Sequence, residues 1–203
     1  MEPATTEEKI LKAAQREFAQ HGYEGARVDR IAQKARINKA MIYYHFKSKE
    51  NLYESLLATV YTAIYHRIAE TMPPDIGPKE KLEYIIGAFI DLIKELDEDF
   101  FRMMLRELSS GGKYFKKLML PRVIIPMIGI IQELFDEGVK QGVFKMVLPH
   151  FSFIQTLGAV IFTNAIRIIL SDTDLGKAMF KDNFFEEFKK NLLTIVETGI
   201  LVQ

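Results

Sequence analysis

The spacing of apolar residues constrains the fold of this chain more than any other feature of its sequence. Almost every segment repeats its apolar positions with the period of a helix, and almost none alternates with the period of a strand. In the first segment, for example, Ile10, Leu11, Ala14 and Phe18 share one helical face. Hydrophobic residues make up 48% of the chain, which is typical of a packed globular protein. The sequence therefore predicts an all-α fold with one large core or with a small and a larger one.

Capping and breaking residues indicate where the helices begin and end. Thr5 and Glu8 have the spacing of a capping box, and Gly22 is a stop signal for the first helix. A long helix is expected to begin after Ser48 and to run to about Met72. The other expected helices cover residues 27–35, 38–46, 79–96, 100–108, 118–141, 150–170 and 183–201, with loops at 73–78 and 111–112.

The net charge of zero hides an uneven distribution of charge. The 27 basic and 27 acidic residues cancel over the whole chain, but residues 27–49 hold seven bases and one acid. Residues 51–203 hold 17 bases and 20 acids, so one end of the molecule is expected to favour an anion. A run of charge is often only a solvated face, and the residue pattern inside the run has to decide its meaning.

Two short amphipathic helices occupy the basic stretch. The first has an apolar face made of Val28, Ile31, Ala32 and Ala35. The second begins at Asn38, a good N-cap, with Ile37 and Ile42 in the arrangement of a hydrophobic staple. Ile42 and Phe46 are then expected to point inward together.

The opposite face of the second helix carries residues that are unusual in water. It is centred on Ala40 and Tyr44 and flanked by Met41 and Tyr43. Two helices joined by a tight turn, the second with an exposed face ringed by bases, describe a helix-turn-helix that reads the major groove of DNA. Tyr43 and Tyr44 have an alternative role, packing against the first and fourth helices. The expected DNA-binding residues are Arg27, Arg30, Asn38, Lys39, Ala40, Met41, Tyr43, Tyr44, His45 and Lys49.

This region resembles the N-terminal signature of the TetR family of bacterial transcriptional repressors. The resemblance rests on Ile31-Ala32, on Ile37 in the turn and on the run from Ile42 to Leu52, and it covers about 45 residues. The chain has Arg36 where the family usually has Gly, and Ala26 and Arg27 where it usually has Ser or Thr. The resemblance implies a helix-turn-helix domain at 1–50 and a helical ligand-binding and dimerisation domain at 51–203. It also implies a two-fold dimer in which a small molecule changes the spacing of the two DNA-reading heads.

Two helices of the larger part are expected to form the dimer interface. Apolar residues cover more than one face of the last helix, so it is expected to be buried by a partner as well as by its own core. The segment 150–170 has the same property, and Gly158 would allow close helix approach. The alternative is that both segments are core helices of a monomer. The apolar residues of the last helix are Phe184, Phe185, Phe188, Leu192, Ile195 and Val196.

Composition alone indicates a site for a hydrophobic effector in the larger part. Methionine and aromatic side chains supply adaptable apolar walls, although each of them also suits an ordinary core. Arg167 is expected to meet an anionic ligand or to pair with an acid. The proposed ligand-binding residues are Phe89, Met103, Met104, Tyr114, Phe115, Met119, Phe144, Phe151, Phe162, Asn164 and Arg167.

These observations predict a repressor that leaves a palindromic double-stranded DNA operator when a hydrophobic small molecule binds. The alternative is a helical small-molecule carrier whose basic patch binds polyanions or membrane without reading bases.

An enzyme is not expected, because the four histidines are scattered and there is no cysteine, phosphate-binding loop or nucleophile elbow. The sequence predicts no cofactor and no metal. The acidic N-terminus does not resemble a secretory signal, so the protein is expected in the cytoplasm. The uncharged stretch 146–166 is expected to be buried in protein and not in a membrane, because its polar residues would be costly in lipid.

Overall fold

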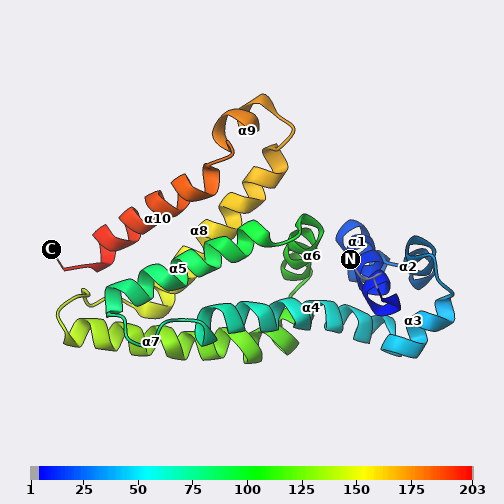
Figure 1. Ribbon diagram of the computed structural model, residues 1–203, viewed down its shortest axis with the longest axis horizontal. Helices are drawn as coiled ribbons and strands as arrows, with labels where there is room; N and C mark the ends of the chain where they lie inside the picture. The colour runs from blue at the N-terminus through cyan, green and yellow to red at the C-terminus, as the bar shows by residue number, and fades with distance from the viewer. Residues whose placement is uncertain (1–4, 203) are drawn as a thin grey trace. The chain divides into compact units, whose positions relative to one another are not determined.

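The computed structural model describes residues 5–202, and nearly all of them belong to helices (Figure 1). The described chain contains no strand, and its one isolated bridge joins Phe144 to Leu201. This confirms the all-α prediction. The helices are α1 (Thr6–Gly25), α2 (Val28–Ala35), α3 (Lys39–Phe46), α4 (Lys49–Tyr65), the π-helical turn η1 (His66–Glu70), α5 (Pro78–Glu95), α6 (Glu98–Ser109), the π-helical η2 (Phe115–Ile124), α7 (Ile125–Lys140), α8 (Pro149–Leu170), α9 (Asp174–Met179) and α10 (Phe184–Ile200).

The N-cap of α1 forms as the sequence predicts, whereas Gly22, the expected stop, kinks the helix without ending it. The Thr5 hydroxyl accepts from the Glu8 N–H at 3.2 Å, and the Thr5 N–H donates to the Glu8 carboxylate at 2.8 Å. Gly22 interrupts the helix with φ of 67°, a backbone conformation that glycine adopts without a Cβ clash. The helix therefore kinks at Gly22, and one more turn carries it on to Gly25.

The region expected to be one helix at 118–141 differs from the prediction. It starts earlier, at Phe115, and has a π-helical first part, η2, that contains Pro121. Pro126 lies in the first turn of α7, where a missing N–H costs little. The short helix α9 was not predicted, because six residues are too few to show a helical period.

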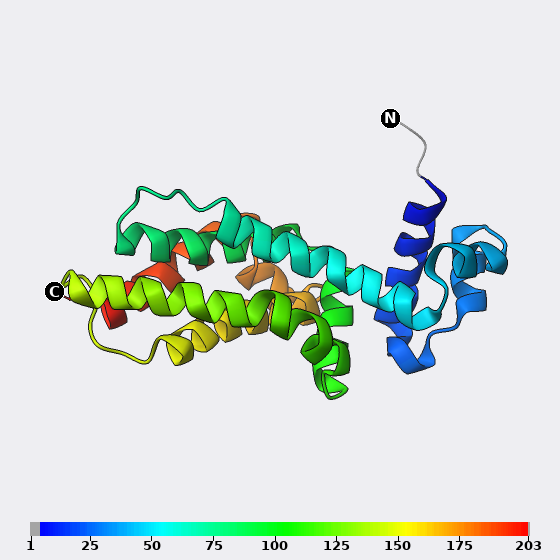
Figure 2. The same ribbon diagram turned by 90° about the horizontal axis from the view of Figure 1, so that it is seen from below.

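The helices form two compact units, of which the first contains residues up to 63 and residues 96–123. In this unit α1 packs against α2 and α6, and Figures 1 and 2 show α1, α2 and α3 grouped together. Aromatic rings fill its core: the Tyr53 ring lies 4.7 Å from Phe18, 5.1 Å from Tyr23 and 4.9 Å from Tyr114 between centroids. These edge and tilted contacts fix α4 against α1.

Glu107 is a buried acid within the first unit. Its carboxylate accepts from the backbone N–H of Tyr114 at 2.7 Å, from that of Phe115 at 3.3 Å and from the Tyr53 hydroxyl at 3.2 Å. Burial, with the Glu107 carboxylate nearby, raises the pKa of the Tyr53 hydroxyl, which therefore stays a donor. Glu107 thus ties α6 to α4 and to the start of η2.

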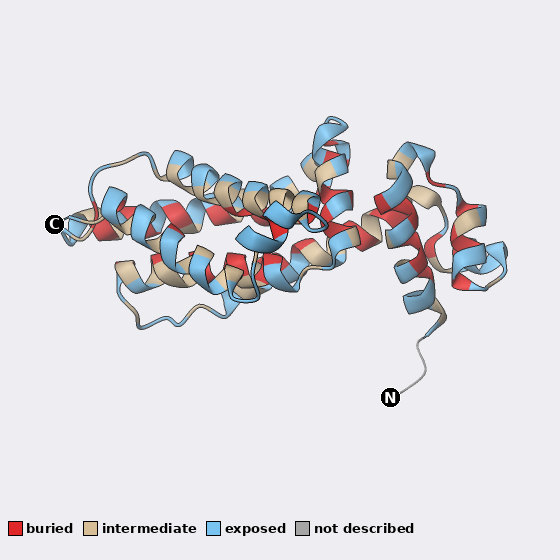
Figure 3. Cartoon of the chain, turned by 90° about the horizontal axis from the view of Figure 1, so that it is seen from above, coloured by how far each residue is buried: buried red, intermediate tan, exposed pale blue. Residues whose placement is uncertain are grey.

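The second unit contains residues 64–95 and the described residues from 124 on. Its central helix is α5, which packs against η1, α7, α8 and α10. Helix α5 is buried on all sides at residues 85–90, whereas α8 and α10 have only three and two buried residues; Figure 3 colours the helices by burial. The two units are defined by packing, whereas the boundary at 50/51 separates a DNA-binding from a ligand-binding domain. That functional boundary stays a prediction.

Candidate functional site

Helix α3 has one buried face and one exposed face, as the sequence predicts. Ile42 and Phe46 are buried, and Ala40 on the opposite side is exposed. The side chains of Met41, Tyr43 and Tyr44 are 37%, 42% and 70% exposed. Exposed apolar and aromatic side chains grouped on one helix face are typical of interaction surfaces, and contact of this face with DNA stays a prediction.

Two turns in unusual backbone conformations fix the ends of α3. Arg36 precedes it with φ of 55° and ψ of 46°, and Lys47 follows it with φ of 65°. For a non-glycine residue this conformation costs about 1 kcal/mol or more, so the surrounding structure must hold it. The Asn38 side chain accepts from the Ala40 N–H at 2.8 Å and completes the N-cap.

Basic side chains lie beside the exposed face of α3. Lys39 forms an ion pair with Asp29 of α2 at 2.7 Å, and this hydrogen bond raises the pKa of Lys39. Lys47 donates to the Tyr44 carbonyl at 2.9 Å, with its ammonium 5.6 Å from the Tyr44 ring centroid. Both bases remain exposed at the rim, where a phosphate can reach them.

Lys49, at the start of α4, connects this helix to α1. Its ammonium donates to the Glu24 carbonyl at 3.3 Å and lies 4.6 Å from the Tyr23 ring centroid. The Ser48 hydroxyl accepts from the Asn51 N–H at 3.0 Å and caps the helix. The N-terminus of α4 is thereby held beside α1 with its base in place.

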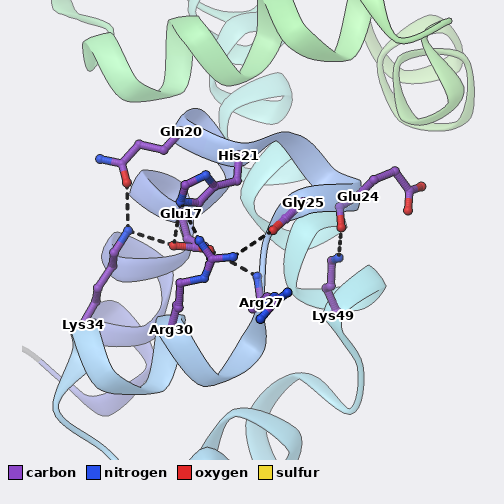
Figure 4. Close-up of polar contacts among 9 residues, drawn as sticks. All are labelled: Glu17, Gln20, His21, Glu24, Gly25, Arg27, Arg30, Lys34 and Lys49. Atoms are coloured by element: carbon purple, nitrogen blue, oxygen red, sulfur yellow. Dashed lines mark hydrogen bonds and ion pairs between the residues drawn. The ribbon is translucent and has the colours of Figure 1, made fainter.

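A buried acid that the sequence analysis missed organises the basic stretch. Glu17 of α1 is fully buried, and its carboxylate lies 2.8 Å from the Lys34 ammonium and 3.3 Å from Arg30 Nε (Figure 4). The Arg27 N–H donates to the same carboxylate at 3.2 Å, and His21 Nε2 lies 3.7 Å away. The signal was present in the sequence, because Glu17 falls on the apolar face of the first helix, one turn after Ala14.

The charge of Glu17 is preserved despite its burial. Burial on its own would raise the pKa of this carboxyl, but hydrogen bonds from Lys34 and from the Arg27 backbone outweigh it and leave the pKa below its ordinary value. Glu17 therefore neutralises part of the basic stretch and orients Arg30, which also lies 2.9 Å from His21 Nε2. The count of seven bases in residues 27–49 therefore overstates the positive charge available to an anion, because Arg30 and Lys34 are paired with Glu17.

The expected DNA-binding residues all lie in the first unit, on or next to α2, α3 and the start of α4. Arg30, His45 and Lys49 are half-buried, and Arg30 and Lys49 are engaged in the contacts described above. Contact of any of the ten residues with DNA stays a prediction. The others are exposed: Arg27, Asn38, Lys39, Ala40, Met41, Tyr43 and Tyr44.

An apolar cavity lies within the second unit, among α5, α7, α8 and α10. Its empty volume, opening included, is about 460 Å³, and side chains such as Ile85, Phe135 and Leu157 line it. Of the described residues that line it, Ser152 and Thr156 of α8 are the only polar ones, and none is charged. The arrangement suits an uncharged apolar group with a weak hydrogen-bonding end.

The residues expected to bind a ligand are not gathered around this cavity, except for Phe89. Phe144 packs against Gly138, which leaves the room that the ring fills, and against Phe135 at 5.1 Å between centroids. Five others lie in the first unit, because the segments that carry them pack there and not against α5: Met103, Met104, Tyr114, Phe115 and Met119.

The remaining expected ligand residues are on α8. The amide oxygen of Asn164, which is buried, accepts from Arg167 Nε at 2.9 Å, and the Arg167 guanidinium lies 5.3 Å from the Phe185 ring centroid. Arg167 was expected to meet an anion or an acid, but its partners among the described residues are an amide and a ring. Phe151 and Phe162 point outward and are 55% and 68% exposed.

Helices α8 and α10 leave a large apolar surface uncovered. Ile154, Ile169 and Ile195 are 58%, 64% and 60% exposed, in addition to Phe151 and Phe162. Two stretches, Phe115–Lys140 and Pro149–Leu170, are long and apolar enough to cross a membrane. For Pro149–Leu170 the mean hydropathy is 1.7 and 17% of the apolar window is buried, so most of this apolar helix lies outside the core.

The chain is similar to known bacterial regulatory proteins in both sequence and fold. The sequence profile of the bacterial regulatory proteins of the tetR family matches residues 10–56. The repressor NicS of Pseudomonas putida is 27% identical over 82% of this chain and 79% of its own. The regulator YttP of Bacillus subtilis is 29% identical over 96% of each chain. Among solved structures, a candidate fatty acid metabolism regulator of Clostridium perfringens has a TM-score of 0.76 at 22% identity, covering 96% of this chain and all of its own.

Proposed function

Because the chain belongs to the TetR family of bacterial regulatory proteins, we propose that it is a repressor released from a palindromic operator by a hydrophobic small molecule. The observation that carries the proposal is the two-faced helix α3. Ile42 and Phe46 hold it to the core, and Met41, Tyr43 and Tyr44 stand in solvent within the matched segment. A helix built this way can enter the major groove without losing its own packing.

The residues proposed to bind DNA have two different roles. Ala40 lets the backbone approach the bases, and Met41 and Tyr44 contact base edges or a thymine methyl group. Arg27, Lys39 and Lys49 contact phosphates and set the orientation of α3. Only the first group carries sequence information.

The operator is palindromic because the protein is a two-fold dimer formed through α8 and α10. The exposed phenylalanines and isoleucines of α8 and Ile195 of α10 support this proposal. A second copy of the same helices covers them with a matching apolar surface, as two-fold symmetry requires. A protein partner also accounts for the apolar length of α8 without a membrane.

The effector binds the cavity beside α5, within the proposed ligand-binding domain at 51–203. Its apolar walls and the hydroxyl groups of Ser152 and Thr156 suit the chemistry of an aliphatic chain, and the walls have to move apart to admit one. One relative, 25% identical over 68% of this chain, is the fatty acid metabolism regulator protein of Bacillus subtilis. A long-chain fatty acid is therefore the first effector to test.

Regulation requires two states of the dimer with different affinities for both ligands. In one state the two α3 helices match successive turns of DNA, and in the other the effector has displaced α4 and moved them out of register. By linkage, an effector that weakens operator binding must itself bind less tightly to the operator complex.

The protein acts by binding and not by catalysis, and it acts on DNA in the bacterial cytoplasm. Its relatives are transcriptional regulators. The rival function is a carrier whose basic head binds polyanions without reading bases, which predicts equal affinity for all duplexes.

Selection of bound duplexes from a random library at about 0.15 M salt separates the two functions. The regulator enriches a palindrome with half-sites about one helical turn apart, or a multiple of it. Binding without enrichment would favour the carrier and refute the proposal.

Two substitutions then separate recognition of the base sequence from sequence-independent binding to phosphates. Ala40→Leu should weaken the selected site by about 10- to 100-fold and leave random duplexes unchanged. Arg27→Gln should weaken both about equally, because the exposed Arg27 side chain contacts phosphate. Adding a long-chain fatty acid to the operator complex should release the protein. Unchanged operator affinity at saturating fatty acid would refute this effector class and leave base reading intact.

A further inference from the structure

A basic groove between α1 and α2 is not used by the proposed DNA-reading face. Lys9, Lys12 and Arg16 lie on one side of α1 at helical spacing, and Lys34 of α2 stands on the other wall. Gln20 and two alanines complete the lining. Among the described residues, no carboxylate lines the groove.

The bases of α1 are available to a ligand. Lys9, Lys12 and Arg16 are exposed, and none of them forms an ion pair with a carboxylate of the described residues. The Lys34 ammonium donates to the buried Glu17 carboxylate at 2.8 Å and to the Gln20 side-chain oxygen at 3.0 Å. The groove is therefore positive, with one wall fixed by hydrogen bonds.

One wall of the groove continues into the proposed DNA-reading helix. Ala35 lines the groove, and the N-cap of α3, Asn38, is three residues further along the chain. Three residues span at most about 11 Å between Cα atoms. The wall that ends at Ala35 therefore lies close to the N-terminus of α3.

The spacing of the bases fits a phosphate backbone. From Lys9 to Arg16 the helix rises about 10.5 Å, since each residue adds about 1.5 Å. One DNA strand carries a phosphate about every 3.4 Å along the axis, so this length covers about three intervals between phosphates. The three bases on this side of α1 are therefore spaced on the same scale as neighbouring phosphates.

We propose that the groove lined by Lys9, Lys12, Arg16 and Lys34 binds the DNA phosphate backbone outside the half-site read by α3. This inference rests on the proposed DNA-binding function and extends its footprint into flanking DNA. It gives affinity without sequence information, because phosphates are the same in every sequence.

The test compares two duplexes that contain the selected operator. A core duplex ends at the half-sites, and an extended duplex adds about one helical turn, roughly ten base pairs, on each side. The variant is Lys9→Gln/Lys12→Gln/Arg16→Gln, which leaves Lys34 and its contact with Glu17 intact. Affinity is measured for both duplexes over a range of salt concentrations.

The wild-type protein should bind the extended duplex more tightly than the core duplex and with a steeper salt dependence. Each phosphate contact contributes about 0.9 to the slope of log affinity against log salt. Loss of three contacts in each of two subunits should therefore make the variant's slope on the extended duplex shallower by about 5. On the core duplex the variant and the wild type should agree.

Two control proteins make the result specific to this groove. Lys9→Arg/Lys12→Arg/Arg16→Lys keeps the charges and should keep the wild-type slope. Arg122→Gln/Lys177→Gln/Lys190→Gln removes three exposed bases elsewhere and should also leave it unchanged.

The outcomes separate this inference from the function on which it rests. If the variant and the wild type have the same slope and affinity on the extended duplex, the groove does not bind DNA, although α3 still does. If the variant loses affinity equally on both duplexes with an unchanged slope, its effect is structural and the inference is wrong. Failure of the wild type to select any operator would refute the DNA-reading function and this inference with it.

Discussion

The two compact units bury different chemistry. The first unit encloses two carboxylates, Glu17 and Glu107, and each of them accepts hydrogen bonds from several donors. The second unit has a mainly aliphatic core, a cavity without charged lining and two helices with exposed apolar faces. Hydrogen bonds to a buried charge have a narrow geometry, whereas apolar contacts tolerate repacking. The first unit thus holds its helices through directional hydrogen bonds, whereas the second leaves apolar surface exposed and space unfilled.

The largest effect is expected at the apolar face of the second unit. Phe162→Asp places a charge in each half of the symmetric interface, so a loss of about 4 kcal/mol in dimerisation free energy is expected, about 1,000-fold in dissociation constant. Sedimentation equilibrium measures the mass. Leu175→Asp, which changes an equally apolar residue that is 58% exposed on α9, should leave the dimer intact. A dimeric Phe162→Asp protein would mean that this part of α8 is not the interface.

The next effect concerns the buried acid of α6. Glu107→Leu leaves two backbone N–H groups and the Tyr53 hydroxyl without their acceptor, so the free energy of unfolding should fall by about 3 kcal/mol. Denaturant titration measures the change. Glu98→Leu is the matched control on the same helix, because its exposed pair with Arg102 contributes about 0.5 kcal/mol or less. Equal losses for the two variants would contradict the special role of Glu107.

A smaller effect, which depends on pH, is expected at Glu17. Its pKa lies below the ordinary value of 4.5, so its charged contacts stabilise the folded state fully above that pH, and the stability is lost as the pH falls through the folded-state pKa. Glu17→Gln should therefore cost about 1–2 kcal/mol near pH 7 and less at acid pH. Denaturant titrations of both proteins from pH 7 to pH 3 give the difference in unfolding free energy. If the difference in unfolding free energy between the two proteins grew on acidification, Glu17 would not be stabilised in its charged form.

The smallest effect is a gain in stability at the turn before α3. Arg36 has φ of 55°, and Arg36→Gly removes the steric cost of a Cβ there, so the free energy of unfolding should rise by about 0.5–1 kcal/mol. Gln33→Gly, three residues earlier in α2, should lower it by about 1 kcal/mol, because glycine costs entropy inside a helix. Thermal unfolding of both variants gives the two signs. Destabilisation by Arg36→Gly would show that its side chain contributes more than its backbone costs.

Local sequence patterns predicted the ends and faces of helices α1 and α3 well. Thr5, Gly22 and Asn38 act as capping or breaking residues at their expected places, and Ile42 and Phe46 are buried opposite an exposed α3 face. All of these depend on neighbours within a few residues, so the order of residues along the chain contains them. The role of Glu17 was missed because its partners on α2 lie 10 to 17 residues away.

The ligand cavity shows the opposite case. Composition identified aromatic and methionine residues suitable for a pocket, but only Phe89 of that set lines the cavity. Met103, Met104 and Tyr114 have the same chemistry and are buried in the other unit. A side chain that suits a pocket equally suits a core, and nothing in its local sequence distinguishes the two.

The sequence by itself determined the helical class, the positions of most helices, the two faces of α3 and the excess of base beside it, because each follows from local spacing and residue type. Only the tertiary structure decided which bases are already paired, which apolar residues enclose the cavity and which helix faces stay uncovered. These properties depend on contacts between segments distant in sequence, and the side-chain packing that selects among such contacts is not encoded in any single segment.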